Sequence, residues 1–266
     1  MSAGAGGAVG ERASPRRIVS LVPSLTEALF ALGLGERVVG VTDWCVHPAD
    51  AVASLPKLGG TKNPSREAIL ELRPDLVIAN HEENTRRDVE FLQKAGLAVW
   101  VTDPRSVSGA VALLRELAAL GATESRARAV IEPIEAALRA VDARAAMPRT
   151  RVFCPIWKRP WMAVGPDTYA DDLLRVCGGG NVFGDRTKRR YPIVEEAEIA
   201  AAAPEVILLP DEPYAFGPRD VAELARWQVP AAEAGRIHLL DGTLVSWYGP
   251  RMARAIETLV PLLASG

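Results

Sequence analysis

The sequence predicts an α/β protein of two lobes, each with a mainly parallel sheet, joined by a single long helix. Three observations support this fold class. Strand-like and helix-like segments alternate through both halves of the 266 residues. A long helical pattern without strands separates the halves. Similar segments also recur at a constant distance, since Pro74 and Pro204 each precede a buried apolar run (204 − 74 = 130).

The first half alternates short strands with helices. Strand-like runs lie at 17–22, 38–41, 76–79 and 98–102, and helix-like stretches at 24–32, 64–73, 86–95 and 107–120. Ser24 and Glu27 have the spacing of a capping box, and Asn63-Pro64 is typical of a helix start. Residues 76–79 show no polar alternation, which indicates a strand buried on both faces of a parallel sheet.

Residues 123–147 are the predicted connecting helix, because apolar residues recur there at helical spacing. Pro133 within it should bend the helix or mark its true start. The second half repeats the first, with a strand at 151–153, a helix capped near Thr168 and a buried strand up to Leu209. We therefore expect Rossmann-like lobes at 17–122 and 148–266, preceded by a disordered tail at 1–16.

The composition excludes several classes of protein. Hydrophobic residues make up 48% and charged residues 24%, which is typical of globular chains and unlike disordered ones. The 31 Lys+Arg against 33 Asp+Glu give a net charge of −2, so no overall positive field favours nucleic acid. The three cysteines, Cys45, Cys154 and Cys177, form no CxxC pair, and we expect them to be small core residues.

The first residues predict the location. Residues 1–16 are rich in Gly and Ala but lack the apolar stretch of a secretory signal, so the chain as written is expected to be cytoplasmic. No run approaches the roughly 18 apolar residues of a membrane span, so no membrane insertion is expected.

Catalytic motifs are missing from the sequence. It contains no GxSxG, no Walker A motif and no HExxH. Residues 178–184 are rich in Gly but follow a predicted helix, which favours a helix stop over a nucleotide loop. The three histidines, His47, His81 and His238, would all have to converge to form a three-His metal site, and we expect no such site.

Aromatic residues gather in loops that follow predicted strands. They are Trp44, Trp157, Trp161, Tyr191, Trp247 and Tyr248. Core packing alone does not explain this placement, and rigid rings are common walls of binding pockets. Basic residues at 158–159 and 188–190 lie in the same class of loop, and either contact an anionic ligand or form a solvated rim. Because strand-end loops of α/β lobes carry ligand sites, we expect the site in the cleft between the lobes.

Three segments match a known family. They are Arg17 to Ser24 with Thr26-Glu27, Leu72 to Ile78, and Val176 to Phe183. On these the chain resembles the substrate-binding proteins of ABC importers that bind cobalamin or ferric siderophores, also called helical-backbone metal receptors, over about residues 17 to 264. It is most similar to the cobalamin-binding branch, through the Cys-Gly-Gly-x-Asn-hydrophobic-Phe run and the loop from Trp44 to Pro48.

The resemblance implies a small-molecule ligand, an ABC permease as partner, no catalytic cofactor, and a monomer that binds no nucleic acid. Aromatic side chains cradle the corrin ring in that branch, and Trp44, Trp157 or Ile156, and Tyr191 fall at matching positions. The full set of expected ligand contacts is Trp44, Asn80, His81, Trp157, Lys158, Arg190, Tyr191 and Trp247. A glutamate on each lobe docks on permease arginines in the family; Glu67 fits the first, and Glu196 and Glu198 flank the second.

The leading interpretation is a binding protein, not an enzyme, that binds a cobalamin-like corrinoid or another metal chelate between its lobes for ABC-type uptake. A ferric-siderophore binder is an alternative. So is a cytoplasmic relative that carries a chelate or acts as a metal-assisted enzyme, with His81 as ligand and Glu82 or Glu83 as base. A third reading is an interaction module with a vestigial pocket.

Overall fold

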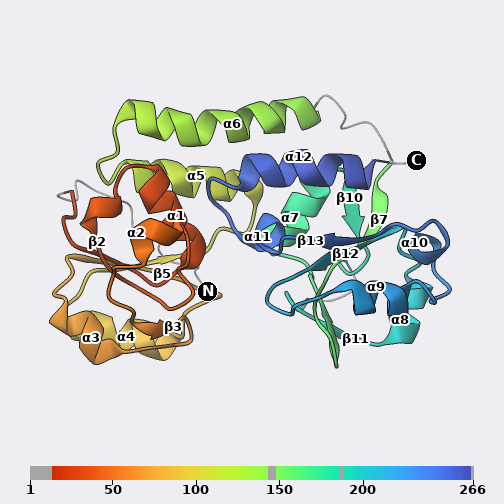
Figure 1. Ribbon diagram of the computed structural model, residues 1–266, viewed down its shortest axis with the longest axis horizontal. Coiled ribbons are helices and arrows are strands. Elements are labelled where there is room, and N and C mark those ends of the chain that lie inside the picture. The colour runs from red at the N-terminus through yellow and green to blue at the C-terminus, as the bar shows by residue number, and fades with distance from the viewer. Residues whose placement is uncertain (1–13, 143–147, 186–187, 265–266) are drawn as a thin grey trace, which may run out of the picture. The chain divides into compact units, whose positions relative to one another are not determined.

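The structure is a computed structural model that describes residues 14–142, 148–185 and 188–264 (Figure 1). The chain divides into two compact units. Unit 1 comprises Met1–Asp103 and Ala112–Ile131, and unit 2 comprises Pro104–Val111 and Glu132–Gly266. Their border passes through helices α5 (Val107–Ala118) and α6 (Glu124–Asp142). The predicted lobe boundaries, 17–122 and 148–266, stay a prediction, and most of the predicted tail, residues 1–13, lies outside the described residues.

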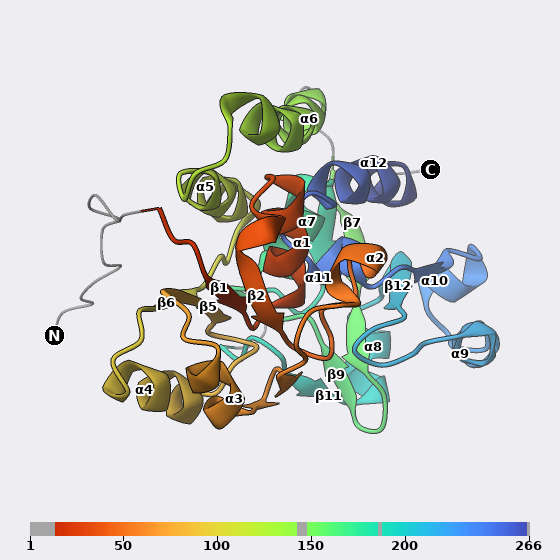
Figure 2. The ribbon, with the colours of Figure 1, turned by 60° about the vertical axis from the view of Figure 1, so that its left-hand side comes forward.

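Unit 1 has a four-stranded parallel sheet in the order β2-β1-β5-β6. Its strands are β1 (Ile18–Ser20), β2 (Val38–Val41), β5 (Leu76–Asn80) and β6 (Val99–Thr102), with a small antiparallel pair of β3 (Gly59–Gly60) and β4 (Asn63–Pro64). Its other helices are α1 (Pro23–Ala31), the 3₁₀ turn η1 (Gly35–Arg37), α2 (Ala49–Val52), α3 (Arg66–Glu71) and α4 (Arg86–Lys94). Helix α1 lies on one side of the sheet, and α3 and α4 lie on the other (Figures 1 and 2). The predicted parallel sheet is confirmed.

Unit 2 has the same strand order, β10-β7-β12-β13, again all parallel. These strands are β7 (Thr150–Phe153), β10 (Gly179–Asn181), β12 (Val206–Pro210) and β13 (Ile237–Leu240). A three-stranded antiparallel sheet accompanies it, made of β8 (Pro155–Trp157), β9 (Trp161–Ala163) and β11 (Ile193–Val194) in the order β11-β9-β8. Its helices are α7 (Tyr169–Val176), α8 (Glu196–Ala201), α9 (Pro218–Leu224), α10 (Pro230–Glu233), α11 (Thr243–Ser246) and α12 (Met252–Leu263).

The central strand of each unit is buried on both faces. Every residue of β5 and of β12 is buried, which agrees with their continuous apolar sequences. Between β5 and its outer helices lies a cluster of Val19, Leu21, Leu58, Ile69, Val77 and Leu92. In unit 2 the corresponding cluster is aromatic, since Phe153 packs against both Trp161 and Phe183 at centroid distances of 6.1 and 5.9 Å. These clusters hold the helices on the sheets.

The turn before each central strand is the same in both units. Arg73 and Ala203 both have a φ of 44°, the left-handed conformation that ends a helix, and each precedes a proline. Prolines at these positions stop α3 and α8, because proline cannot continue a helix. The predicted repeat between the halves is therefore a repeat of backbone conformation as well as of sequence.

An arginine at the start of the first strand of each unit caps the helix that leads into the central strand. The Arg17 guanidinium donates to the carbonyl of Leu72 at 2.7 Å. The Arg151 guanidinium donates to the carbonyl of Ala202, where the Nε–O distance is 3.1 Å, and also to that of Ala203. These carbonyls would otherwise lack partners at the helix ends. The two arginines thus join the sheet to the helix that crosses it.

Some predicted elements are wrong in detail. Helix α1 begins at Pro23 after Val22 and has no side-chain cap, so Ser24 and Glu27 form no capping box. Asn63-Pro64 is strand β4, paired with Gly59-Gly60, and Ser65 caps α3 instead. Helix α6 continues through Pro133, while the last residues of the predicted connecting helix, 143–147, lie outside the described part.

The three cysteines are buried and form no disulfide. Cys45 lies 3.1 Å from the hydroxyl of Thr26 and 3.1 Å from that of Thr42. Burial raises the pKa of Cys45, and it raises the pKa of Cys154 and of Cys177 to about 12. The prediction of three small core residues is confirmed.

Replacing Arg151 with alanine tests the cap on α8. We expect the free energy of unfolding to fall by about 1–2 kcal/mol, because the helix-end carbonyls lose their donor. Urea denaturation followed by circular dichroism measures the change. The control is Arg128→Ala, which removes an arginine paired with Glu124 on the exposed surface of α6 and should leave stability near the wild-type value. Equal losses in both variants would contradict the capping role.

Candidate functional site

The parallel sheet of each unit brings several loops together at the carboxyl ends of its strands. In unit 1 these are the loops after β2 and β5, with the β3–β4 hairpin beside them. In unit 2 they are the β8–β9 hairpin and the loops after β10, β12 and β13. Ligands of α/β proteins bind at this edge of the sheet.

Trp44 is the most exposed aromatic side chain among the large hydrophobic residues, with 65% of its surface accessible. It follows β2, and its indole nitrogen lies beside Gly60 of the hairpin. A Cβ built on Gly60 would lie 3.6 Å from that nitrogen and 2.4 Å from the side-chain oxygen of Asn63. Glycine at this position therefore leaves room for the Asn63 side chain within the hairpin, while the Trp44 nitrogen lies at ordinary contact distance.

A buried amide fixes the other loops of unit 1. The Asn84 side chain accepts from the Asn80 backbone N–H at 2.8 Å and donates to the carbonyls of Thr61, at 2.9 Å, and Leu21, at 3.3 Å. It thus joins β1, β5 and the hairpin. Asparagine suits this position because its amide both donates and accepts without carrying a charge.

The Asn80 side chain is also buried and bonds to the backbone of neighbouring segments. It is 2% exposed, donates to the Thr102 carbonyl at 3.0 Å and accepts from the Glu82 backbone N–H at 2.7 Å. The next residue, His81, has an exposed side chain. Of this predicted pair of ligand contacts, the structure presents His81 at the surface and uses Asn80 to shape its loop. Lys62 of the hairpin donates to the carbonyl of Glu82 in the same loop.

In unit 2 the β8–β9 hairpin presents Trp157, which is 43% exposed. Its ring packs edge-on against Tyr214, with centroids 5.5 Å apart, and Tyr214 in turn lies 4.6 Å from Phe216. Phe216 stacks on the buried Trp161 at 6.1 Å. This aromatic row, Trp157-Tyr214-Phe216-Trp161, supports the exposed ring from the core outward.

The next hairpin residue, Lys158, points inward. It is 7% exposed, and its ammonium donates to Asp220 at 2.6 Å and Glu223 at 2.8 Å, both on α9. Burial favours the neutral amine, but the two carboxylates outweigh it and raise the pKa of Lys158. Burial likewise opposes ionisation of Asp220, yet the bond from Lys158 leaves its pKa lowered. This predicted ligand contact thus anchors the hairpin to α9.

Arg190 and Tyr191 are placed by a close backbone approach. The Gly165 N–H donates to the Arg190 carbonyl at 2.8 Å, and a Cβ on Gly165 would lie 2.4 Å from the Arg189 carbonyl. The Arg190 side chain donates to the carbonyl of Asp167 at 2.8 Å. Both predicted contacts are half-buried and lie beside β9.

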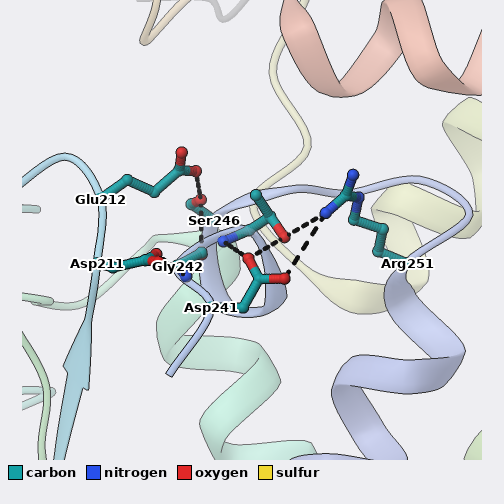
Figure 3. Close-up of polar contacts among 7 residues, drawn as sticks. Asp211, Glu212, Asp241, Gly242, Ser246 and Arg251 are labelled. Carbon is teal, nitrogen blue, oxygen red and sulfur yellow. Dashed lines mark hydrogen bonds and ion pairs between the residues drawn. The ribbon is translucent and has the colours of Figure 1, made fainter. Parts of the chain in front are cut away.

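Polar bonds tie together the loops after β12 and β13 (Figure 3). Asp211 accepts from the Gly242 N–H at 2.7 Å, and Glu212 accepts from the Ser246 hydroxyl at 3.0 Å. Further along, Arg251 donates to the Thr243 hydroxyl at 2.8 Å and lies 3.8 Å from Asp241. The guanidinium of Arg251 also covers the ring of the predicted contact Trp247, 4.8 Å from its centroid.

The predicted docking glutamates lie at two helix starts. Glu67 is an exposed residue in the first turn of α3, and Glu196 is the exposed first residue of α8. Glu198 closes a capping box, since its carboxylate accepts from the Glu195 N–H at 2.8 Å. Both Glu196 and Glu198 are exposed, and Glu196 also accepts from the Trp161 indole at 3.5 Å, so Glu198 differs by closing the capping box.

Sequence reasoning missed Tyr214 and Glu212. A usable signal was present, because both follow the buried run at 206–209 that predicted a central strand. Among the described residues, no group of three or more His, Cys, Asp and Glu side chains is placed to hold a metal ion. In the same part of the chain, no helix combines the length and apolar character required to cross a bilayer.

Several known proteins are similar to this chain in sequence and in fold. A family model described as "Periplasmic binding protein" matches residues 18–244. The ABC transporter substrate-binding lipoprotein YvrC of Bacillus subtilis is 29% identical over 92% of this chain and 79% of its own length. A vitamin B12-binding protein of Vibrio vulnificus (strain CMCP6) is 26% identical over 94% of this chain and 90% of its own length.

A solved structure is similar across nearly the whole chain. The periplasmic heme-binding protein RhuT from Roseiflexus sp. RS-1, in its apo form, superimposes with a TM-score of 0.77 and 28% identity. The match covers 93% of this chain and 97% of that protein. The predicted two-lobed α/β fold class and the predicted family resemblance are both confirmed by these similarities.

Replacing Lys158 with methionine tests its anchoring role. We expect the free energy of unfolding to fall by about 2 kcal/mol at neutral pH, because Asp220 loses its partner in a largely buried position. Urea denaturation at several pH values measures this loss. The control, Arg86→Met, removes an arginine whose side chain is 91% exposed and should leave stability unchanged.

The pH dependence gives a second check on Lys158. Since the pKa of Asp220 is lowered, its stabilisation is complete above the unfolded-state pKa of about 3.9 and is lost as the pH falls through the lowered value. Since the pKa of Lys158 is raised, the contribution of Lys158 to the free energy of unfolding is complete below the unfolded-state pKa of about 10.4. The gap between wild type and variant should therefore be constant from about pH 5 to 9 and shrink in stronger acid. A gap that does not change below pH 4 would refute the pairing.

Proposed function

Because the chain belongs to the periplasmic binding protein family, we propose that it captures a cobalamin-like corrinoid for ABC-type uptake. Its role is that of a substrate-binding protein and not of an enzyme, as predicted, so a corrinoid would be cargo rather than a catalytic cofactor. The alternative of a metal-assisted enzyme, with His81 and Glu82 or Glu83 in catalysis, is excluded by the family.

The expected cytoplasmic location is wrong. The family is periplasmic, YvrC is a lipoprotein and RhuT is periplasmic, so this chain acts outside the cytoplasm. The expectation rested on the first residues of the sequence, whereas the family match rests on residues 18–244. A cytoplasmic carrier is excluded for the same reason.

The exposure of Trp44 and Trp157 is the observation that carries the proposal. Trp44 follows β2 and Trp157 ends β8, and their side chains remain 65% and 43% exposed although tryptophan is normally mostly buried. A corrin macrocycle offers broad apolar faces that such rings can cover. The other predicted contacts that face outward or lie half-buried, His81, Arg190, Tyr191 and Trp247, complete the proposed set.

Haem is a second candidate ligand. RhuT, at 28% identity, is a heme-binding protein. The exposed imidazole of His81 is a nitrogen donor of the kind that coordinates haem iron. Exposed basic residues near the site, such as Arg159 and Arg189, would suit the carboxylates of a haem better than the amides of a corrinoid.

Calorimetric titration of the purified protein separates these ligands. Cyanocobalamin, cobinamide, haemin and a ferric hydroxamate siderophore are titrated in turn. Micromolar or tighter binding of either corrinoid supports the proposal. Binding of haemin alone moves the assignment to haem, and binding of the siderophore alone assigns the chain to that branch. If all four fail to bind, the proposed ligand class is wrong.

Removing either exposed tryptophan should weaken binding. We expect Trp44→Ala and Trp157→Ala each to lower corrinoid affinity about tenfold or more, because each loses roughly 1–3 kcal/mol of apolar contact. Calorimetry with cyanocobalamin measures this loss. The matched control is Phe91→Ala, which removes an aromatic ring of 37% exposure on α4 beneath Arg66. Unchanged affinity in a tryptophan variant would remove that residue from the site.

We also propose that Glu67 and Glu196 dock on arginines of an ABC permease, with the protein acting as a monomer. Both are exposed, whereas Glu198 is used in the α8 cap. Glu67→Arg and Glu196→Arg should each reduce stimulation of the permease's ATPase in reconstituted liposomes at least tenfold, through charge repulsion. The control is Glu71→Arg, an exposed change at the other end of α3. Full stimulation by Glu67→Arg would disprove the docking role.

A further inference from the structure

We propose that Glu212 is a positioning residue that holds Trp247 at the carboxyl edge of the unit 2 sheet and holds it less tightly when protonated. The functional meaning rests on the proposed role of Trp247 as a ligand contact. The structural claim concerns two loops of unit 2 and does not depend on which ligand binds.

The loops that carry these residues are in direct contact. A Cβ built on Gly242 would lie 2.4 Å from Cγ of Glu212 and 2.8 Å from its backbone nitrogen. Only glycine lets the loop after β13 come this close to the loop after β12. The Asp211 carboxylate fixes the same approach through the Gly242 N–H at 2.7 Å (Figure 3). Glu212 is thereby held at the start of the segment that carries Trp247.

The Glu212 carboxylate has two side-chain donors. The Ser246 hydroxyl donates at 3.0 Å, and the Trp247 side chain donates as well. The indole N–H is the only donor that tryptophan has, so this bond fixes the orientation of the ring. On the ring face, the Arg251 guanidinium lies 4.8 Å from the centroid. Trp247 is thus held at its edge by a carboxylate and at its face by a cation.

The charges around Glu212 make its ionisation state sensitive to pH. Burial raises the pKa of Glu212, and the negative charges of Asp211 and Asp241 raise it further, against the lowering effect of the bonds from Ser246 and Trp247. The cation Arg251 lies 3.8 Å from Asp241 and donates to the Thr243 hydroxyl. Glu212 therefore takes up a proton at a higher pH than an exposed glutamate, whose pKa is about 4.3.

Protonation turns one oxygen of the Glu212 carboxyl group from a hydrogen-bond acceptor into a donor. An ionised carboxylate accepts both bonds, whereas the neutral acid carries a donor O–H on one of its oxygens. A charge-assisted bond also weakens when the charge is lost. The bond at the Trp247 edge then weakens, because only the uncharged carbonyl oxygen remains as a full acceptor, while Arg251 still covers the ring face. As the pH falls through the raised pKa of Glu212, the ring gains freedom and the affinity for ligand falls.

Fluorine NMR of protein labelled with 5-fluorotryptophan tests the positioning directly, without ligand. The Trp247→Phe variant identifies the Trp247 resonance. We expect this resonance to shift between pH 7 and 4 with a midpoint above 4.3. Glu212→Gln keeps an acceptor oxygen but cannot ionise, so the shift should disappear. The control, Glu257→Gln, removes an exposed carboxylate on α12 and should leave it in place. A resonance that does not titrate, or titrates equally in Glu212→Gln, overturns the proposal.

A second variant, Ser246→Ala, tests the same assignment with Glu212 in place, so the test does not depend on the folding of Glu212→Gln. Ser246→Ala removes the other donor to the carboxylate, so the midpoint of the Trp247 shift should move to higher pH. An unchanged or lower midpoint contradicts the assignment of the titration to Glu212.

The functional arm uses cyanocobalamin, or haemin if only haemin binds. Wild-type affinity should fall about two- to tenfold more between pH 7 and 4 than that of Glu212→Gln. Equal pH dependence in both proteins would refute the coupling to ligand. If the fluorine shift depends on Glu212 but neither compound binds, the proposed ligand has failed and the positioning role stands.

Discussion

The burial of one central strand in each unit determines much of the remaining structure. Strands β5 and β12 have no face open to water, so both need helices on either side. Because their neighbours run parallel to them, the chain must return by a crossover after each strand. Every such return places the next loop at the carboxyl edge. The candidate site residues therefore lie on loops or at strand ends, and the rigid buried sheet sets their positions.

The two units stabilise their loops with different chemistry. In unit 1 two neutral amides form the central bonds, with Asn84 joining three segments and Asn80 shaping the loop that begins at His81, and Lys62 adds a charged donor to the Glu82 carbonyl. Unit 2 uses charges, with Lys158 between two carboxylates and Arg251 beside Asp241. Neutral amide bonds are insensitive to pH, whereas charged groups respond to protons and salt. The two halves of a repeated fold have thus acquired different sensitivities to their surroundings.

The sequence predicts features that depend on short-range pattern. Proline at 74 and 204, each before an unbroken apolar run, correctly indicated the repeated helix stop and the buried strands. The anchoring role of Lys158 could not be predicted, because its partners Asp220 and Glu223 lie 62 and 65 positions away in the sequence. The sequence pattern of a basic loop residue is the same whether its side chain is buried or exposed. Strands β8, β9 and β11 have only two or three residues, too few to show periodicity. The predicted capping box at Ser24 was wrong because Pro23 already occupies the first helical position, which places Ser24 inside the helix.

The burial of the three cysteines suits a member of a periplasmic protein family. Outside the cytoplasm, disulfides form and persist, and an accessible thiol is a hazard for mispairing. At a pKa of about 12, only about one Cys154 or Cys177 thiol in 10⁵ is ionised at neutral pH, and the thiolate is the form that attacks a disulfide. Ionised thiols of Cys154 and Cys177 are therefore rare in the folded protein, which protects both residues from disulfide exchange.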